Sequence, residues 1–181
     1  MSYTQNLYFL PSGTVDKFNV IIEIPHGSQN KYELDAKTGA LFLDRVLYGA
    51  AFYPGNYGFI PSTKAEDGDA ADVIVYMTNS VPPCTVVPCR ALGIMKMEDS
   101  GDLDSKIIAV PVDDPYFNDI QDIQDLPSHK IKELSDFFEN MQKFKKGVWV
   151  KNVNKILGVG DKAEAQTEIA RYLNNYTEYK E

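Results

Sequence analysis

Alternation of hydrophobic and polar positions dominates the chain from about residue 18 to about residue 112 and predicts short antiparallel strands. The runs are rich in Val, Ile, Phe and Tyr, and Gly, Pro, Asn and Asp separate them. In FNVIIEI one face of the expected strand carries Phe18, Val20, Ile22 and Ile24. The other face carries Glu23 as a lone carboxylate. Several short strands paired in sequence order predict a small barrel.

The segment KYELDAKTGALFLDR predicts a hairpin whose turn is DAKTG. A two-residue period places Lys31 and Glu33 on one face of the first strand. On the second strand it places Leu41, Leu43 and Arg45 on one face. A cation, an anion and a second cation are therefore expected to converge.

The last third of the chain changes to a helical period. In LPSHKIKELSDFFENMQKF the apolar positions are Ile131, Leu134, Phe138 and Met141. Pro127 and Ser128 form a starting signal. A helix over about 128–145, packed on the barrel, is the prediction.

A second helix is expected over about 161–178, in DKAEAQTEIARYLNNY. Asp161 and Glu164 have the spacing of a capping box. Its apolar stripe consists of Ala165, Ile169, Tyr172 and Tyr176. The expected fold class is therefore α+β and mainly β.

The composition bounds the function. With 181 residues, 44% of them hydrophobic, the chain is expected to form one domain over residues 1–181. The N-terminal stretch has no positive charge before Lys17 and only a short apolar run, which predicts a cytoplasmic protein without a signal peptide or membrane anchor. A net charge of −8 disfavours nucleic acid as a partner and points to solubility or to cations.

The soft-metal ligands are few. Cys84 and Cys89 have no nearby His to complete a zinc set, so both are expected to be reduced thiols in strands or the core. His26 and His129 are solitary in their segments and are interpreted as surface or structural residues.

Acidic residues carry the most informative pattern. In EDGDAADVIVYM, Asp67, Asp69 and Asp72 lie on a Gly-containing turn that leads into a buried strand. Turn aspartates often only bond the backbone or face water, so the segment needs corroboration. A second acidic turn supplies it, because Asp99 and Asp104 are expected to close a hairpin. The two turns are predicted to meet at one mouth of the barrel.

Two other readings of the first turn fail on spacing. A calcium loop of the EF-hand type needs an acidic or amide residue where Ala71 stands and a distal Glu, which the segment lacks. A phosphatase with an Asp nucleophile needs an apolar strand before the acidic pair, but TKAE precedes Asp67.

Carboxylates that lie close together repel one another, so the expected cluster favours bound cations. Each like-charged pair about 4 Å apart costs about 4 kcal/mol at an effective dielectric constant of about 20, and divalent cations remove that cost. All-oxygen ligands select hard ions, and magnesium fits best when phosphate oxygens complete its shell. Phosphate is thus the expected substrate class. Complementary donors are available in Lys31, Arg45, Lys106, Tyr53 and Tyr57.

These segments together resemble the soluble family I inorganic pyrophosphatases. The match runs in order, over about residues 18–151, through IIEIP, KYE, GALFLDR, FYPGNYGFIP, EDGDAADVIV, GIMKMED, DLDSKIIAVP, DIQDLP, FFE and KGVWVK. The resemblance implies an OB-like five-stranded antiparallel barrel with two flanking helices. It also implies hydrolysis of pyrophosphate to two phosphates, several Mg²⁺ ions per subunit with Mn²⁺ or Zn²⁺ as substitutes, and, for bacterial members, a homohexamer.

The resemblance also assigns roles by position. Metal ligands would be Asp67, Asp72, Asp104, Asp99, Glu33 and Glu23. Asp69 would accept a proton from the attacking water, with Tyr57 beside it. Substrate contacts would come from Lys31, Glu33, Arg45, Tyr53, Tyr57 and Lys106.

The chain departs from the family after FFE. The family usually has His-Tyr-Lys there, whereas this chain has Asn140, Met141 and Gln142, so two phosphate donors are absent. Met141 is interpreted as a packing residue. Lys145 or Lys146, one helical turn further on, is expected to substitute. A smaller departure is that HGSQN, after Glu23, is one residue shorter than usual.

Three hypotheses follow for function. The first is an active, magnesium-dependent inorganic diphosphatase. The second is a weakened or inactive relative that works by metal or phosphate binding or by association. The third, an oligonucleotide-binding barrel, would need a basic groove, which the net charge of −8 disfavours.

Overall fold

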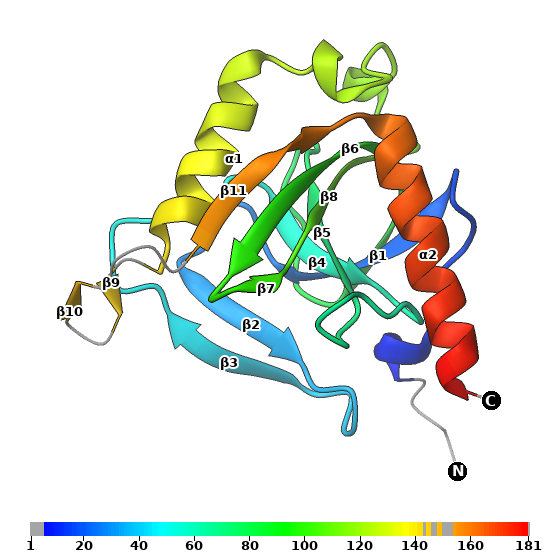
Figure 1. Cartoon of the computed structure of the whole chain (residues 1–181), viewed down its shortest axis with the longest axis horizontal. Helices are drawn as coiled ribbons and strands as arrows, with labels where there is room; N and C mark the ends of the chain where they lie inside the picture. The colour runs from blue at the N-terminus through cyan, green and yellow to red at the C-terminus, as the bar shows by residue number, and fades with distance from the viewer. Residues whose placement is uncertain (1–5, 143, 146–147, 150–153, 181) are drawn as a thin grey trace.

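Five strands close into a ring at the centre of the molecule (Figure 1). The computed structural model describes residues 6–142, 144–145, 148–149 and 154–180. In ring order the strands are β1 (Phe18–Ile24), β4 (Asn56–Ile60), β5 (Ala71–Val75), β8 (Lys106–Pro111) and β6 (Thr85–Asp99), which pairs again with β1. The predicted OB-like barrel is confirmed.

One pair of neighbouring strands differs from the predicted antiparallel arrangement. β5 and β8 run parallel, with Val73 opposite Ile107, while the other four pairs of the ring are antiparallel. A closed ring with an odd number of strands cannot alternate direction throughout, so at least one pair has to be parallel. Here β5 runs in the direction of β1 because β4 pairs antiparallel with both, and β8 runs in the direction of β1 because β6 pairs antiparallel with both, so β5 and β8 are parallel.

The ring strands pack two hydrophobic clusters on their opposite faces. Phe18, Val20 and Ile22 of β1 belong to the first cluster, as the period predicts. Ile24 belongs to the second cluster, because the register with β4 shifts between Ile22 and Ile24. The prediction of one shared face was therefore wrong at Ile24.

The predicted hairpin is formed by β2 (Asn30–Leu34) and β3 (Leu41–Val46), beside the barrel (Figure 1). Its register shifts between Lys31 and Tyr32: Arg45 lies opposite Lys31, and Leu43 lies opposite Tyr32. Asp44 is the extra residue of this bulge. Arg45 consequently shares the face of Lys31 and not that of Leu43, which corrects the predicted face.

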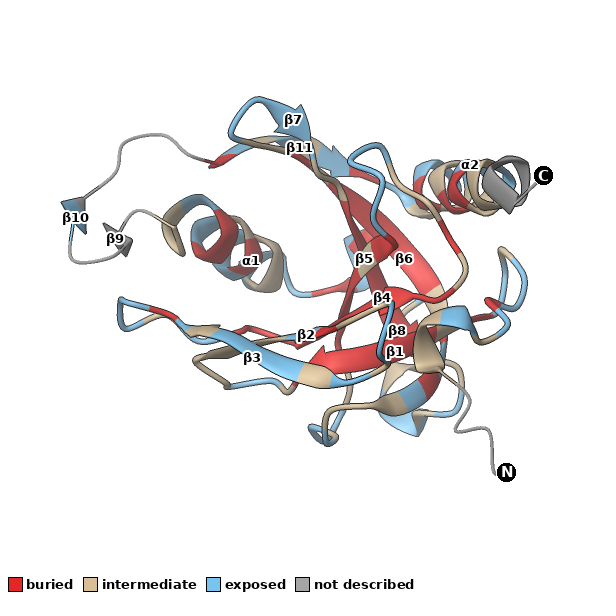
Figure 2. Cartoon of the chain, turned by 90° about the horizontal axis from the view of Figure 1, so that it is seen from below, coloured by how far each residue is buried: buried red, intermediate tan, exposed pale blue. Residues whose placement is uncertain are grey.

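The long strand β6 extends beyond the ring. There it pairs with β7 (Asp102–Leu103) and with β11 (Asn154–Gly160). Buried residues concentrate on the ring strands and on the inner sides of the helices, whereas β3 and β7 are largely exposed (Figure 2). Short 3₁₀ helices occur at Leu7–Phe9, Pro115–Phe117 and Ile123–Asp125.

Two α-helices flank the barrel, as predicted. α1 (Ser128–Asn140) buries Leu134, Phe137 and Phe138 in the second cluster. No helix in the described part of the chain is long and apolar enough to span a membrane.

α2 (Lys162–Lys180) packs its predicted stripe residues Ala165, Ile169 and Tyr172 into the first cluster. The Asp161 carboxylate accepts a hydrogen bond from the Glu164 N–H at 2.9 Å and so caps this helix.

α1 ends five residues earlier than predicted. The Met141 N–H closes its last turn on Phe137, and Phe144–Lys145 forms strand β9, which pairs with β10 (Val148–Trp149). Because the pairing partner of this backbone lies in β10, the helix does not continue. The expected placement of Lys145 on a helix face with Gln142 is therefore wrong, and Lys146 lies outside the described residues.

Candidate active site

The candidate residues named from the sequence line two adjoining pockets of about 490 and 350 Å³, which we call together the acidic pocket. Five of them line both parts: Lys31, Tyr57, Asp67, Asp69 and Asp72. The larger part adds Glu23 and Glu33, and the smaller part adds Arg45, Tyr53, Asp99, Asp104 and Lys106. The structure therefore brings together every candidate from β1, the β2–β3 hairpin, the segment from Tyr53 into β4, the two acidic turns and the start of β8.

The first acidic turn is built around Gly68. This residue has a φ of +93°, a conformation that L side chains rarely adopt. The turn folds back so that the Asp69 N–H donates to the Asp67 carboxylate at 3.0 Å. The Ala65 N–H donates to the Asp69 carbonyl at 2.8 Å. Asp67 and Asp69 are both exposed, and both line the two parts of the acidic pocket.

Lys106 is the charged centre of the pocket. It is 3% exposed, and its ammonium donates to both Asp72 and Asp104. Burial lowers the pKa of Lys106, but the two carboxylates outweigh burial and the pKa is raised. Burial also raises the pKa of Asp104. The charge of Lys106 opposes this rise, and the charge of Asp72 adds to it. Two carboxylates thus share one ammonium.

Glu23 is the deepest carboxylate. It is 8% exposed and accepts a hydrogen bond from the Leu34 N–H at 2.7 Å. Burial raises its pKa to about 8, and Asp72 and Glu33 add to the rise. The same cause raises the pKa of the Asp67 carboxyl, where the Asp69 N–H opposes it.

The two tyrosines are donors in this setting. Burial raises the pKa of Tyr57 well above its usual value, with further contributions from Asp72 and Asp104, and burial also raises the pKa of Tyr53. Both hydroxyls therefore remain protonated at neutral pH. Their rings pack 5.5 Å apart, centroid to centroid.

The hairpin positions two cations over the pocket. Lys31 pairs with Glu33, and its ammonium lies 3.6 Å from the Asp44 carboxylate. Arg45 donates to the same Asp44 carboxylate at 2.5 Å. The two-residue period of a strand does not predict the bulge, so the sequence pattern does not place Asp44 beside the two cations.

The second acidic turn meets the end of α1. The Ser100 hydroxyl and the Gln142 amide each donate to one carboxylate oxygen of Asp99 at 2.9 Å. Met141 packs against the second hydrophobic cluster, as expected. Asn154, which no motif singled out, lies opposite Asp99 in the β6–β11 pair and lines the pocket.

The donor set fits hard cations. The pocket offers carboxylate oxygens at several depths with neither His nor Cys among its lining residues. In the described part of the chain, no three acidic, His or Cys side chains already surround one point as a metal site would. Lys106 provides the positive charge between Asp72 and Asp104. A cation that took over this compensation would relieve the same repulsion.

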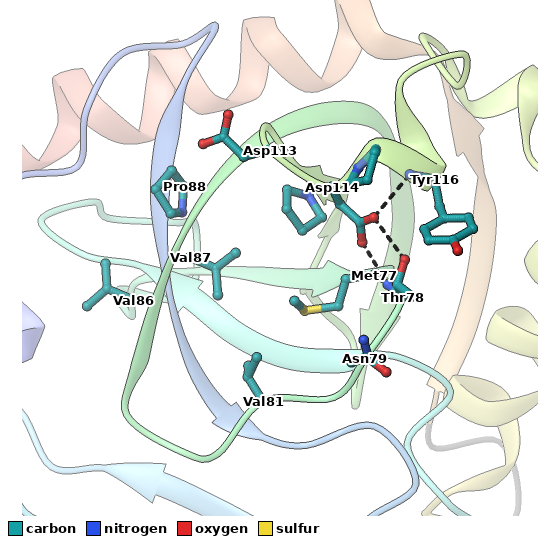
Figure 3. Close-up of a pocket in the computed structure, with 12 residues that line it drawn as sticks. Met77, Thr78, Asn79, Val81, Val86, Val87, Pro88, Asp113, Asp114 and Tyr116 are labelled. Atoms are coloured by element: carbon teal, nitrogen blue, oxygen red, sulfur yellow. Dashed lines mark hydrogen bonds between the residues drawn. The ribbon is translucent and has the colours of Figure 1, made fainter.

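A separate pocket of about 430 Å³ has different chemistry (Figure 3). Its lining is mainly apolar, with Met77, Val87 and Pro88 among its residues. The Asp114 carboxylate accepts hydrogen bonds from the Thr78 N–H and hydroxyl at 2.7 and 2.8 Å, and from the Tyr116 N–H at 3.2 Å (Figure 3). Asp114 therefore stabilises the loop, and the candidate chemistry is confined to the acidic pocket.

Comparisons with known proteins point the same way. A family model described as inorganic pyrophosphatase matches residues 20–177. Soluble inorganic pyrophosphatase 1 of Arabidopsis thaliana is 44% identical over 170 residues, which cover 92% of this chain and 76% of the relative. An inorganic pyrophosphatase of Geobacillus stearothermophilus is 52% identical over 118 residues, 65% of this chain and 72% of the relative. The crystal structure of inorganic pyrophosphatase from Thermus thermophilus superimposes with a TM-score of 0.88 at 43% identity, over 95% of this chain and 99% of that one.

Proposed function

The chain belongs to the inorganic pyrophosphatase family and hydrolyses pyrophosphate to two phosphates, and from this premise we propose how the acidic pocket carries out the reaction. The observation that carries the proposal is the convergence of all the candidate carboxylates, cations and tyrosines on that pocket. We further propose that residues 1–181 act as a single domain.

We propose magnesium as the metal, with Mn²⁺ or Zn²⁺ as substitutes. Its ligands would be Asp67, Asp72, Asp99, Asp104, Glu33 and Glu23, whose oxygens suit a hard ion. Bound there, the cations would lower the pKa of the attacking water and neutralise charge on the leaving phosphate.

Asp69 is the proposed base. Its carboxylate is exposed in the pocket, while its own N–H fixes Asp67, so it can take a proton without loss of the turn. Tyr57 stays protonated and can donate a hydrogen bond to the attacking water or to a phosphoryl oxygen.

Lys31, Arg45, Lys106 and Tyr53 would bind the phosphoryl oxygens. Lys31 and Arg45 reach over the pocket from the hairpin, where Asp44 holds both. Lys106 can exchange its carboxylate partners for phosphoryl oxygens once the charges of Asp72 and Asp104 are compensated by cations.

The experiment measures phosphate release from pyrophosphate with Mg²⁺, with excess chelator, and with Asp69→Asn as a control for contaminating enzyme. We expect release that depends on Mg²⁺ and falls about 10²-fold or more in Asp69→Asn, the usual scale for loss of a general base. Equal release by the wild type and the variant would refute the proposal. The alternative of an inactive binding protein gains no support from the pocket or the comparisons.

We also propose a cytoplasmic homo-oligomer, a hexamer by resemblance to bacterial members of the family. A molar mass from light scattering that corresponds to one chain would contradict the assembly and leave the hydrolysis untouched.

A further inference from the structure

Two side-chain hydrogen bonds hold the end of α1, one to the second acidic turn and one to β11. The Gln142 amide donates to one oxygen of Asp99 at 2.9 Å, and the Asn154 amide donates to the Phe138 carbonyl at 2.8 Å. Asn154 is 8% exposed and lies directly opposite Asp99 in the β6–β11 pair. The last turn of α1 is therefore anchored to β11 beside Asp99, and Gln142, two residues after the helix, bonds Asp99.

Asp99 receives neutral donors on both oxygens. Gln142 bonds one oxygen and the Ser100 hydroxyl bonds the other. Asp72 and Asp104, by contrast, are bonded by the buried Lys106 ammonium. The described hydrogen bonds of Asp99 thus orient its carboxylate without neutralising its charge.

A lysine at position 142, as the family resemblance leads one to expect, would change this balance. A Lys ammonium offers positive charge on a flexible stem, whereas the Gln amide offers a neutral donor. An ammonium beside Asp99 would compete with a cation for the same carboxylate. A partner that orients a metal ligand without competing raises the affinity of the metal.

We propose that Gln142 is a positioning residue that orients Asp99 for a divalent cation. Compared with a chain that has Lys at position 142, this chain would bind a cation more tightly at Asp99 and have one fewer positive charge for phosphate. The inference rests on the proposed function, because it takes Asp99 as a metal ligand. It does not require Gln142 to touch the substrate.

The test measures Mn²⁺ binding to the substrate-free protein by electron paramagnetic resonance. The Mn²⁺ site that depends on Asp99 is the one whose binding is lost in the Asp99→Asn variant. At that site we expect Gln142→Lys to weaken Mn²⁺ binding about tenfold or more, and Gln142→Ala to weaken it less, on the scale known for partners of metal ligands. In the Asp99→Asn background, Gln142→Lys should have no further effect.

The matched control is Gln124→Lys, which makes the same change of charge at an exposed glutamine outside the acidic pocket. Circular dichroism and thermal unfolding establish that each variant is folded. The inference is overturned if Gln142→Ala binds Mn²⁺ like the wild type, if Gln142→Lys binds it like Gln124→Lys, or if Asp99→Asn removes no site.

Pyrophosphate hydrolysis by the wild type distinguishes failure of this inference from failure of the proposed function. Hydrolysis with unchanged Mn²⁺ binding in the Gln142 variants would refute this inference alone. Absence of hydrolysis would refute the proposed function, whatever the binding measurements give.

Discussion

Lys106 and Gln142 both donate hydrogen bonds to carboxylates of the acidic pocket, but only Lys106 carries a charge. Lys106 is buried and bridges Asp72 and Asp104, whereas Gln142 holds the half-buried Asp99 at the rim. Charges removed from water need a partner of opposite sign, while a carboxylate that keeps contact with water does not. The buried ammonium of Lys106 thus needs carboxylate partners, whereas the half-buried carboxylate of Asp99 is held by neutral donors.

The strongest test of this comparison removes the central ammonium. Lys106→Met leaves Asp72 and Asp104 side by side without compensation. We expect the free energy of unfolding in chelator to fall by about 3 kcal/mol, the lower end for a broken buried pair, because both carboxylates keep some exposure. Urea denaturation measures it.

The control is Lys130→Met, which removes an exposed ammonium paired with Glu133. It should cost at most about 0.5 kcal/mol. If the two variants lose the same stability, Lys106 does not neutralise the pocket and the comparison fails.

Glu23 sharpens the comparison, because it is buried with only a neutral donor described on it. Burial raises its pKa to about 8, so the folded protein binds this proton more tightly than the unfolded chain does. Its contribution to stability is therefore complete below the unfolded pKa and is lost as pH rises toward 8.

In metal-free buffer, Glu23→Gln should therefore gain stability relative to the wild type between pH 5 and pH 8, by about 1 kcal/mol per pH unit at most. Urea denaturation at several pH values measures the difference. The exposed Glu139, changed to Gln, is the matched control. A constant difference across this range would contradict the assignment.

Loss of the Asp99 charge should have little effect on the free energy of unfolding. Asp99→Asn removes a charge that no described cation compensates, so we expect the free energy of unfolding in chelator to change by less than about 0.5 kcal/mol. Asp72→Asn, which takes one of the two partners from Lys106, should cost more, about 1–2 kcal/mol. Chemical denaturation of both variants side by side ranks them, and the reverse order would break the comparison.

Ser100→Ala is the smallest expected effect. Ser100 is exposed and donates one neutral hydrogen bond to Asp99, so its loss should change the free energy of unfolding by at most about 0.3 kcal/mol. A loss of more than about 1 kcal/mol in urea denaturation would show that Ser100 has a structural role beyond its hydrogen bond to Asp99.

Much of the site could be predicted because its residues follow regular strands and a marked turn. Asp67, Asp69 and Asp72 are close in sequence around Gly68, and the turn geometry keeps them together. Asp104 and Lys106 have the two-residue spacing of one strand face, and they meet in the structure.

Other features depend on contacts that no local period carries. The bulge at Asp44, which turns Arg45 toward Lys31, arises from pairing between two strands. The helical period continues past Asn140, but Gln142 bonds Asp99 and Phe144–Lys145 pairs with Val148–Trp149, so tertiary contacts override the local preference. Asn154 belongs to no motif, and only the β6–β11 register places it beside Asp99.

The parallel pairing of β5 with β8 has a consequence for how the chain acquires its activity. The chain passes through β6 and β7 between these two strands, so Asp72 and Lys106 cannot meet in a local hairpin. Asp72 and Lys106 come into contact only when β5 and β8 pair, and pairing of strands that are distant in sequence is entropically costly and slow. A nascent or partly refolded chain therefore holds its two acidic turns apart and has no complete pocket. Recovery of catalysis during refolding should coincide with the final closure of the barrel and lag behind the appearance of strands.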